Sequence, residues 1–108
     1  MKYFIALMVF VSFTLGTVLR AADAKAGKTV YDSKCKLCHG PGGEGVAAIA
    51  KSLKVELKPL ASKEVQAKSD ADLKKQSIEG TGKMVPVKGL SDKQIEDLIA
   101  FVRSLAKS

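Results

Sequence analysis

The stretch "CKLCHG" contains both cysteines and the only histidine of this 108-residue chain. Cys35, Cys38 and His39 therefore lie within five consecutive positions. Thiolate sulfur and imidazole nitrogen bind metals, and a pair of thiols can also be oxidised. Three kinds of chemistry are thus open here: a metal site, a redox disulfide, or covalent attachment of a cofactor.

Two of these possibilities fit poorly. A structural zinc ion needs four Cys or His ligands in a tetrahedron, whereas the chain offers three, two of which are adjacent. A thioredoxin-like dithiol normally follows a strand of a βαβ unit, and the sequence predicts no strand. An inert disulfide between Cys35 and Cys38 in an oxidising compartment is also open, but so short a loop stabilises a domain little.

The spacing C-x-x-C-H is typical of covalent haem attachment. Cys35 and Cys38 can reach the two vinyl groups on one edge of the porphyrin. His39 then lies beside the second thioether and can present an imidazole nitrogen to the iron. The stretch therefore predicts one covalently bound haem c, with His39 as an axial ligand of the iron.

An electron-transfer haem takes a second axial ligand, for which a methionine thioether is a common choice. Met84 is the only methionine outside the N-terminal leader described below. A lone methionine more often fills a core, but Gly80, Gly82 and Pro86 predict a loop at this position. We therefore predict Met84 as the second iron ligand, and Lys83 as a conceivable substitute once its amine loses a proton at high pH.

A haem enzyme with an open sixth position is a further alternative. The sequence offers no second histidine for a distal partnership, and Arg103 falls in the predicted terminal helix. We therefore expect no catalytic residues, no enzyme activity and no small-molecule substrate.

The N-terminus has the pattern of a secretory signal peptide. Lys2 precedes an uncharged, mostly apolar run over residues 3–19, and Ala22 and Ala24 form an A-x-A motif. We expect a leader over residues 1–24, cleaved after Ala24, a single domain over residues 25–108, and a periplasmic location. Cleavage after Ala21 or Ala22, or an uncleaved anchor, are the alternatives.

The predicted domain has a small core and a positive charge. Its only aromatic residues are Tyr31 and Phe101, so a large apolar cofactor is needed to complete the core, and the haem-free chain should be largely unfolded.

The first 24 residues hold two of the 18 basic and one of the 11 acidic residues, which leaves the predicted domain with a net charge of +6. This charge favours redox partners with acidic faces, although it can also serve solubility alone. Nucleic acid is not expected, because no aromatic platform accompanies the lysines.

Apolar periodicity predicts three helices. The first covers residues 24–34, and the second covers residues 70–79 with Ser69 as N-cap and Leu73 and Ile78 as buried candidates. The third begins with a capping box of Ser91 and Gln94. Residues 46–53 predict a short helical turn, and "GPGGEG" at 40–45 predicts a turning chain close to the cysteines. The apolar stripe of the third helix consists of Ile95, Leu98, Ile99, Val102 and Leu105.

With these motifs in this order, the chain resembles the class I cytochromes c over nearly its whole predicted domain. The resemblance implies an all-α fold, with three to four helices wrapped around one covalently attached haem. It also implies that Gly27 permits a close crossing of the first and last helices near Phe101. A proline carbonyl should accept the His39 ring N–H; Pro59 is the candidate that the resemblance suggests, and Pro41, which is closer in sequence, is the alternative. "KMVP" departs from the direct Met-Pro of many relatives and leaves the loop geometry open.

The function implied is that of a soluble one-electron carrier between redox partners of a respiratory or similar chain. The alternative is a haem c domain that serves as a fixed subunit or sensor docked on a redox enzyme. We expect a monomer that meets the membrane only through redox-partner complexes or an uncleaved N-terminus.

Overall fold

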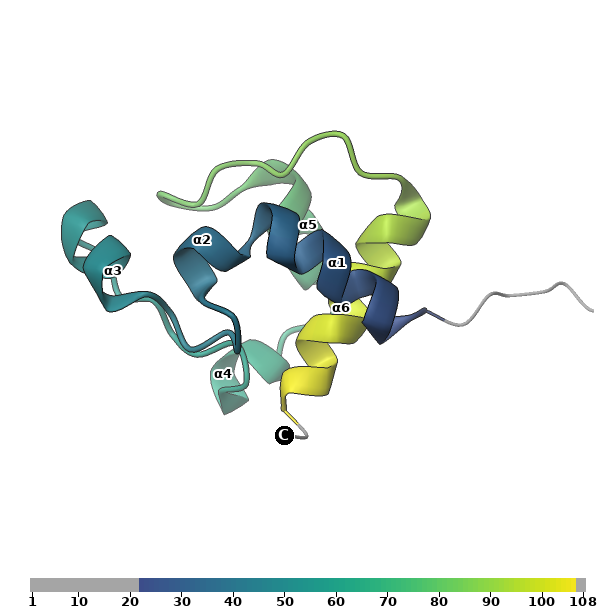
Figure 1. Ribbon diagram of the computed structural model, residues 1–108, viewed down its shortest axis with the longest axis horizontal. Helices are drawn as coiled ribbons and strands as arrows, with labels where there is room; N and C mark the ends of the chain where they lie inside the picture. The colour runs from purple at the N-terminus through teal and green to yellow at the C-terminus, as the bar shows by residue number, and fades with distance from the viewer. Residues whose placement is uncertain (1–21, 107–108) are drawn as a thin grey trace, which may run out of the picture.

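The computed structural model describes residues 22–106, so all but the last three residues of the predicted leader lie outside the described part. The described residues form six helices and no strand (Figure 1). The only bridge of β type among them is an isolated one between Thr81 and Met84. The helices are α1 (Ala24–Lys34), α2 (Lys36–His39), α3 (Ala47–Leu53), α4 (Lys63–Gln66), α5 (Asp70–Glu79) and α6 (Asp92–Leu105). The all-α class is confirmed.

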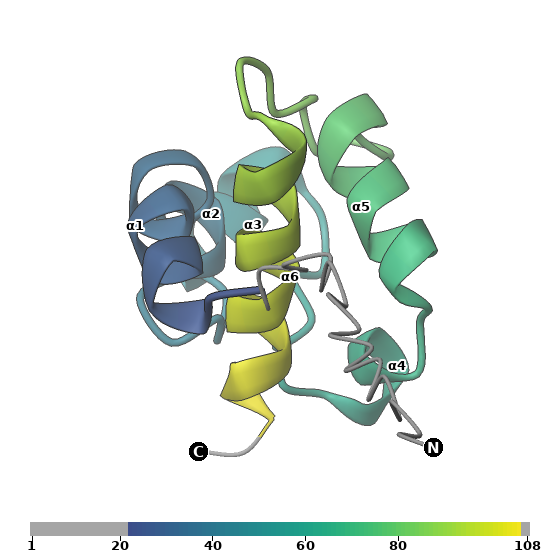
Figure 2. The same ribbon diagram turned by 90° about the vertical axis from the view of Figure 1, so that its right-hand side faces the viewer.

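Helices α1 and α6 cross in close contact and form the centre of the fold (Figure 2). A Cβ atom on Gly27 would overlap the backbone carbonyl of Asp97 and lie 3.0 Å from the Leu98 nitrogen. Only glycine therefore allows this approach of the two backbones. Beside the crossing, the rings of Tyr31 and Phe101 lie 4.8 Å apart between centroids, tilted by 51°. The crossing predicted at Gly27 and Phe101 is confirmed.

Helix α6 has the start and the apolar face that the sequence predicts. The Ser91 side chain accepts a hydrogen bond from the Gln94 amide at 3.1 Å, and the Ser91 amide donates to the Gln94 side chain at 2.9 Å. This reciprocal pair is the predicted capping box. Leu105 at the end of the stripe is only partly buried. The buried members of the predicted stripe are Ile95, Leu98, Ile99 and Val102.

Helix α5 follows the prediction in its bounds but not in all of its packing. Ser69 caps its start by accepting from the Asp72 amide, and Leu73 is buried. The prediction that Ile78 is buried is wrong, because 47% of this residue is exposed. Ile78 lies five residues after Leu73, which turns it roughly 140° around the helix, away from the side on which Leu73 is buried.

The remaining helices are short. The helical turn predicted over residues 46–53 is α3, which Figure 1 places at the outer side of the molecule beyond α2. Helices α2 and α4 were not predicted, because four residues are too few to show a helical period. No helix within residues 22–106 is both long and apolar enough to cross a bilayer.

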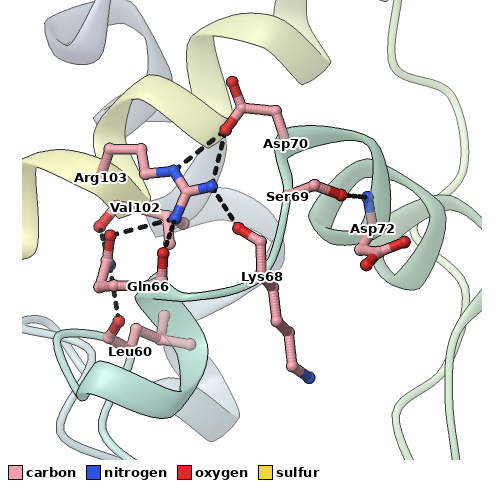
Figure 3. A network of polar contacts seen from close by, with 8 residues as sticks. All are labelled: Leu60, Gln66, Lys68, Ser69, Asp70, Asp72, Val102 and Arg103. Carbon is pink, nitrogen blue, oxygen red and sulfur yellow. Dashed lines mark hydrogen bonds and ion pairs between the residues drawn. The ribbon is translucent and has the colours of Figure 1, made fainter.

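Arg103 of α6 joins the chain segment between α4 and α5 to the central helix pair (Figure 3). Its Nη1 atom donates to the Gln66 carbonyl at 2.8 Å, and its Nη2 atom donates to the Lys68 carbonyl at 2.6 Å. Both Nε and Nη2 also donate to the Asp70 carboxylate, at 3.0 and 2.8 Å. The Gln66 side chain in turn donates to the Leu60 carbonyl at 2.8 Å. One guanidinium group thus holds this segment, whose residues 67–70 are all exposed, against α6.

We expect Arg103→Ala to lower the free energy of unfolding by about 2 kcal/mol, because two carbonyls and a carboxylate lose a charged donor. Guanidinium unfolding of the haem-bearing protein, followed by circular dichroism, measures this. Lys68→Ala is the matched control, since it keeps the backbone carbonyl that Arg103 binds, and it should change stability by less than about 0.5 kcal/mol. Equal losses in the two variants would contradict this role of Arg103.

Candidate functional site

One turn of helix brings together three of the four predicted site residues. The amides of Cys38 and His39 donate to the Cys35 carbonyl at 3.3 and 3.0 Å, and the Gly40 amide donates to Lys36 at 2.8 Å. Cys35, Cys38 and His39 are each partly buried. Both thiols are free, so the structure contains no disulfide between them. The two sulfur atoms and the imidazole therefore start from one short, ordered segment.

The glycine-rich loop after His39 folds back onto this turn. The Gly45 amide donates to the His39 carbonyl at 2.7 Å, and the Val46 amide donates to the Cys38 carbonyl at 2.9 Å. Gly40, at which the chain leaves α2, has a φ of 82°. The predicted turning chain close to the cysteines is confirmed, and it fixes the backbone of the turn from the C-terminal side.

Tyr31 of α1 fixes the same turn from the other side. Its ring is fully buried, and its hydroxyl donates to the Gly40 carbonyl at 2.5 Å. Burial, followed by the nearby Cys35 and Glu44, raises the pKa of Tyr31, so the hydroxyl keeps its proton and remains a donor at high pH. A helical pattern in the sequence indicates that Tyr31 faces the core, but it does not show which group accepts a hydrogen bond from the hydroxyl.

We expect Tyr31→Phe to lower the free energy of unfolding by about 1.5 kcal/mol, because the buried Gly40 carbonyl loses its donor. Thr29→Val removes a hydroxyl from an exposed position of the same helix and should have little effect. Guanidinium unfolding of both holoproteins gives the comparison. A Tyr31→Phe protein as stable as the Thr29→Val protein would contradict the contribution assigned to this bond.

His39 carries an unsatisfied buried nitrogen. Its Nδ1 atom is buried and has no hydrogen-bond partner among the described residues. The predicted bond to Pro59 is absent, and the Pro59 carbonyl instead accepts from the Ser62 amide at 3.0 Å. Burial lowers the pKa of His39, so the ring is neutral near pH 7 and keeps a lone pair for a metal ion. A neutral imidazole whose buried nitrogen lacks a partner fits the predicted haem site.

Cys35 does not have the properties of a redox-active thiol. Burial raises the pKa of Cys35 to about 11, whereas the attacking cysteine of a dithiol enzyme has a lowered pKa. The Cys35 side chain also packs against the core of Tyr31, Leu98 and Phe101. This environment opposes the thioredoxin-like alternative and suits a sulfur that is bonded to a large apolar group.

Met84 lies in the loop between α5 and α6, as predicted. The Thr81 amide donates to the Met84 carbonyl at 3.1 Å, and the Met84 amide donates to the Thr81 carbonyl at 2.9 Å, which closes a tight turn. A Cβ atom on Gly80 would overlap the Met84 carbonyl and lie 3.0 Å from the Pro86 nitrogen, so glycine is required there. Figure 1 shows this loop crossing the top of the molecule, above α2. The role of Met84 as an iron ligand stays a prediction.

Comparison with known proteins gives consistent matches. The family model described as "Cytochrome c" matches residues 24–106. Cytochrome c-554(547) of Halothiobacillus neapolitanus is 34% identical over 90 residues, which cover 79% of this chain and 99% of that protein. The Cbb3-type cytochrome c oxidase subunit CcoP of Azospirillum brasilense is also 34% identical, over 88 residues that cover 79% of this chain but 29% of the subunit.

Among solved structures, the KustC0563 c-type cytochrome resembles the chain in both fold and sequence. The TM-score is 0.63 at 32% sequence identity, and the match covers 73% of this chain and 95% of that one. The helical fold described above therefore agrees with the fold of a c-type cytochrome.

Proposed function

The chain belongs to the cytochrome c family, and we propose from this that Cys35 and Cys38 hold its haem through thioethers while His39 and Met84 bind the iron. The cofactor is one covalently bound haem c, and the function is haem-based electron transfer. The observation that carries the residue assignment is the turn of α2. There, two free, partly buried thiols stand beside an imidazole with an unsatisfied buried nitrogen.

Each proposed ligand is supported by the structure around it. The His39 backbone is held by the Cys35 carbonyl on one side and the Gly45 amide on the other. Met84 is held in its turn by two hydrogen bonds to Thr81. Bound haem supplies an iron that alternates between the ferric and ferrous states. Because His39 and Met84 start from firmly bonded backbone segments, both side chains can keep their positions in the two states, which favours fast transfer of one electron.

We assign the chain the role of a soluble carrier that shuttles electrons between redox proteins in the periplasm, and not that of an enzyme. The family match begins at residue 24, so that all but the last residue of the signal-like leader lies outside the matched part. Arg103 is engaged by Gln66, Lys68 and Asp70, so it is not available for peroxide chemistry. As proposed here, the protein works as a monomer and has no small-molecule substrate.

A second role is favoured by one comparison. The chain matches part of a relative whose name describes a subunit of a cytochrome c oxidase. This match supports the alternative that the domain stays docked on a redox enzyme as a fixed subunit or sensor. Purification from native membranes and soluble extract separates the two roles, because a fixed subunit would co-purify with its enzyme at constant stoichiometry.

Lysines next to the proposed haem ligands are the proposed docking residues for acidic partners. Lys34 and Lys36 flank Cys35, Lys83 precedes Met84, and Lys88 follows in the same loop. All four are exposed. Positive charge around the point of electron exit accelerates association with acidic faces at low salt.

Charge reversal tests this docking surface. Lys36→Glu/Lys83→Glu should slow electron transfer to the anion hexacyanoferrate(III) by about tenfold at low salt and weaken the salt dependence. The same variant should accelerate transfer to a cationic cobalt(III) complex. The matched control, Lys63→Glu/Lys68→Glu, changes the net charge equally around α4 and should have a much smaller effect. Equal stopped-flow rates for the two double variants would contradict the proposed surface.

A further inference from the structure

The residue before α1 caps this helix. The Asp23 carboxylate accepts hydrogen bonds from the amides of Lys25, at 2.9 Å, and Ala26, at 3.2 Å. Its backbone carbonyl accepts from the Gly27 amide at 2.9 Å. The first amides of a helix have no partners within the helix, and an aspartate at this position satisfies them. Asp23 therefore closes the start of the helix that carries Gly27.

Asp23 also bonds to a buried carboxylate on α6. Its amide donates to Oδ1 of Asp97 at 2.8 Å, across 74 residues of sequence. Asp97 is 6% exposed, and a buried carboxylate is costly unless donors surround it. Lys93 supplies the other donor. The Asp23 amide and then Lys93 hold the pKa of Asp97 below its usual range, which agrees with a carboxylate kept ionised by these bonds.

These two contacts meet at the helix crossing. The backbone carbonyl of Asp97 is the group against which Gly27 packs, and the side chain of the same residue accepts from Asp23. Cleavage after Ala24 would remove the α1 cap and one of the two donors to Asp97. The position favoured by the A-x-A motif thus conflicts with the structure of the domain.

We infer that Asp23 belongs to the mature protein and that the leader is removed between Ala21 and Ala22. Water is added across this peptide bond, so that the carbonyl of Ala21 becomes a carboxylate and the nitrogen of Ala22 becomes a free α-ammonium group. A cut one residue later would place the charged Arg20 three positions before the bond, whereas the inferred cut places the uncharged Leu19 there, although the A-x-A pattern has a small residue at this position. This inference rests on the proposed export of the protein.

The first test is the intact mass and N-terminal sequence of the exported, haem-bearing protein, expressed from the full-length gene in a host with haem-attachment machinery. The expected first residue is Ala22. A chain that begins at Asp23 or Lys25, or one that keeps the whole leader, would overturn the inference. A haem-bearing chain that begins at Lys25 would overturn the cleavage site but not the proposed role as an electron carrier. A chain that begins at Ala22 but carries no haem would contradict the proposed function and not the cleavage site.

The second test compares Asp23→Ala with Glu56→Ala, which removes an exposed carboxylate from a loop. Loss of a helix cap typically lowers Tm by about 5 °C in a domain of this size. We expect this shift in the exported Asp23→Ala holoprotein, a mass that reports the substitution, and no shift in the control. If the leader ended at Ala24, the Asp23→Ala protein would have the mass and Tm of the unsubstituted one, and the inference would fail.

Discussion

Replacing Gly27 with valine should lower the free energy of unfolding by about 3 kcal/mol. A Cβ atom at this position, which is fixed rigidly to the α1 backbone, already overlaps the backbone carbonyl group of Asp97. Neither helix can relieve the clash by changing a rotamer, so α1 and α6 have to move apart. The separation would also disturb the ring contact of Tyr31 with Phe101.

Gly82→Ala is the control, because it measures the cost of replacing a glycine where no clash between helices results. A Cβ atom there meets no other atom within 4 Å, and the positive φ of 56° alone should cost about 1 kcal/mol. Yield of haem-bearing protein and guanidinium unfolding of both variants provide the comparison. If Gly27→Val were no more destabilised than Gly82→Ala, the close crossing would not be the reason for glycine at position 27.

Met84→Ala is expected to abolish the absorption band of the ferric protein that arises from the sulfur–iron bond. It should also lower the reduction potential by roughly 0.1 V or more, which is a small part of the ~0.8 V range over which axial ligands set haem potentials. A thioether favours the ferrous iron, so its replacement by water or a lysine amine favours the ferric iron. Optical spectra of the oxidised protein and a potentiometric titration measure both effects.

The control for Met84 is its neighbour Val85, which is 76% exposed. Val85→Ala removes apolar atoms from the same loop without touching the proposed ligand, and it should keep both the band and the potential. A Met84→Ala protein with an unchanged spectrum would show that another group binds the iron. Loss of the band in both variants would point to a general effect of the loop.

The fold could be predicted where the signal was local and periodic. Helix α6 has a capping box at Ser91 and a long apolar stripe, and the resemblance placed its crossing with α1 at Gly27. Helices of four residues carry no such signal. Ile78 was expected inside because it is apolar, yet burial depends on the angle around the helix, and Leu73 already occupies the packed face.

The sequence predicts the residues of the candidate site but not the hydrogen bonds that hold the surrounding helices in place. Cys35, Cys38 and His39 are adjacent in sequence, so their spacing alone indicated one site. The bonds of Arg103 to Gln66 and Asp70 join residues 37 and 33 positions apart, and the bond of Asp23 to Asp97 spans 74. Contacts between distant parts of one sequence follow from tertiary packing, which no local pattern encodes.

The most direct test of the haem assignment is whether colour stays with the unfolded chain. The exported protein, unfolded in guanidinium and separated from small molecules by gel filtration, should elute with its haem absorbance, whereas the Cys35→Ala/Cys38→Ala chain should elute without it. This result would establish that Cys35 and Cys38 hold the haem covalently. Haem that leaves the unfolded chain, or that stays with the double variant, would contradict the assignment.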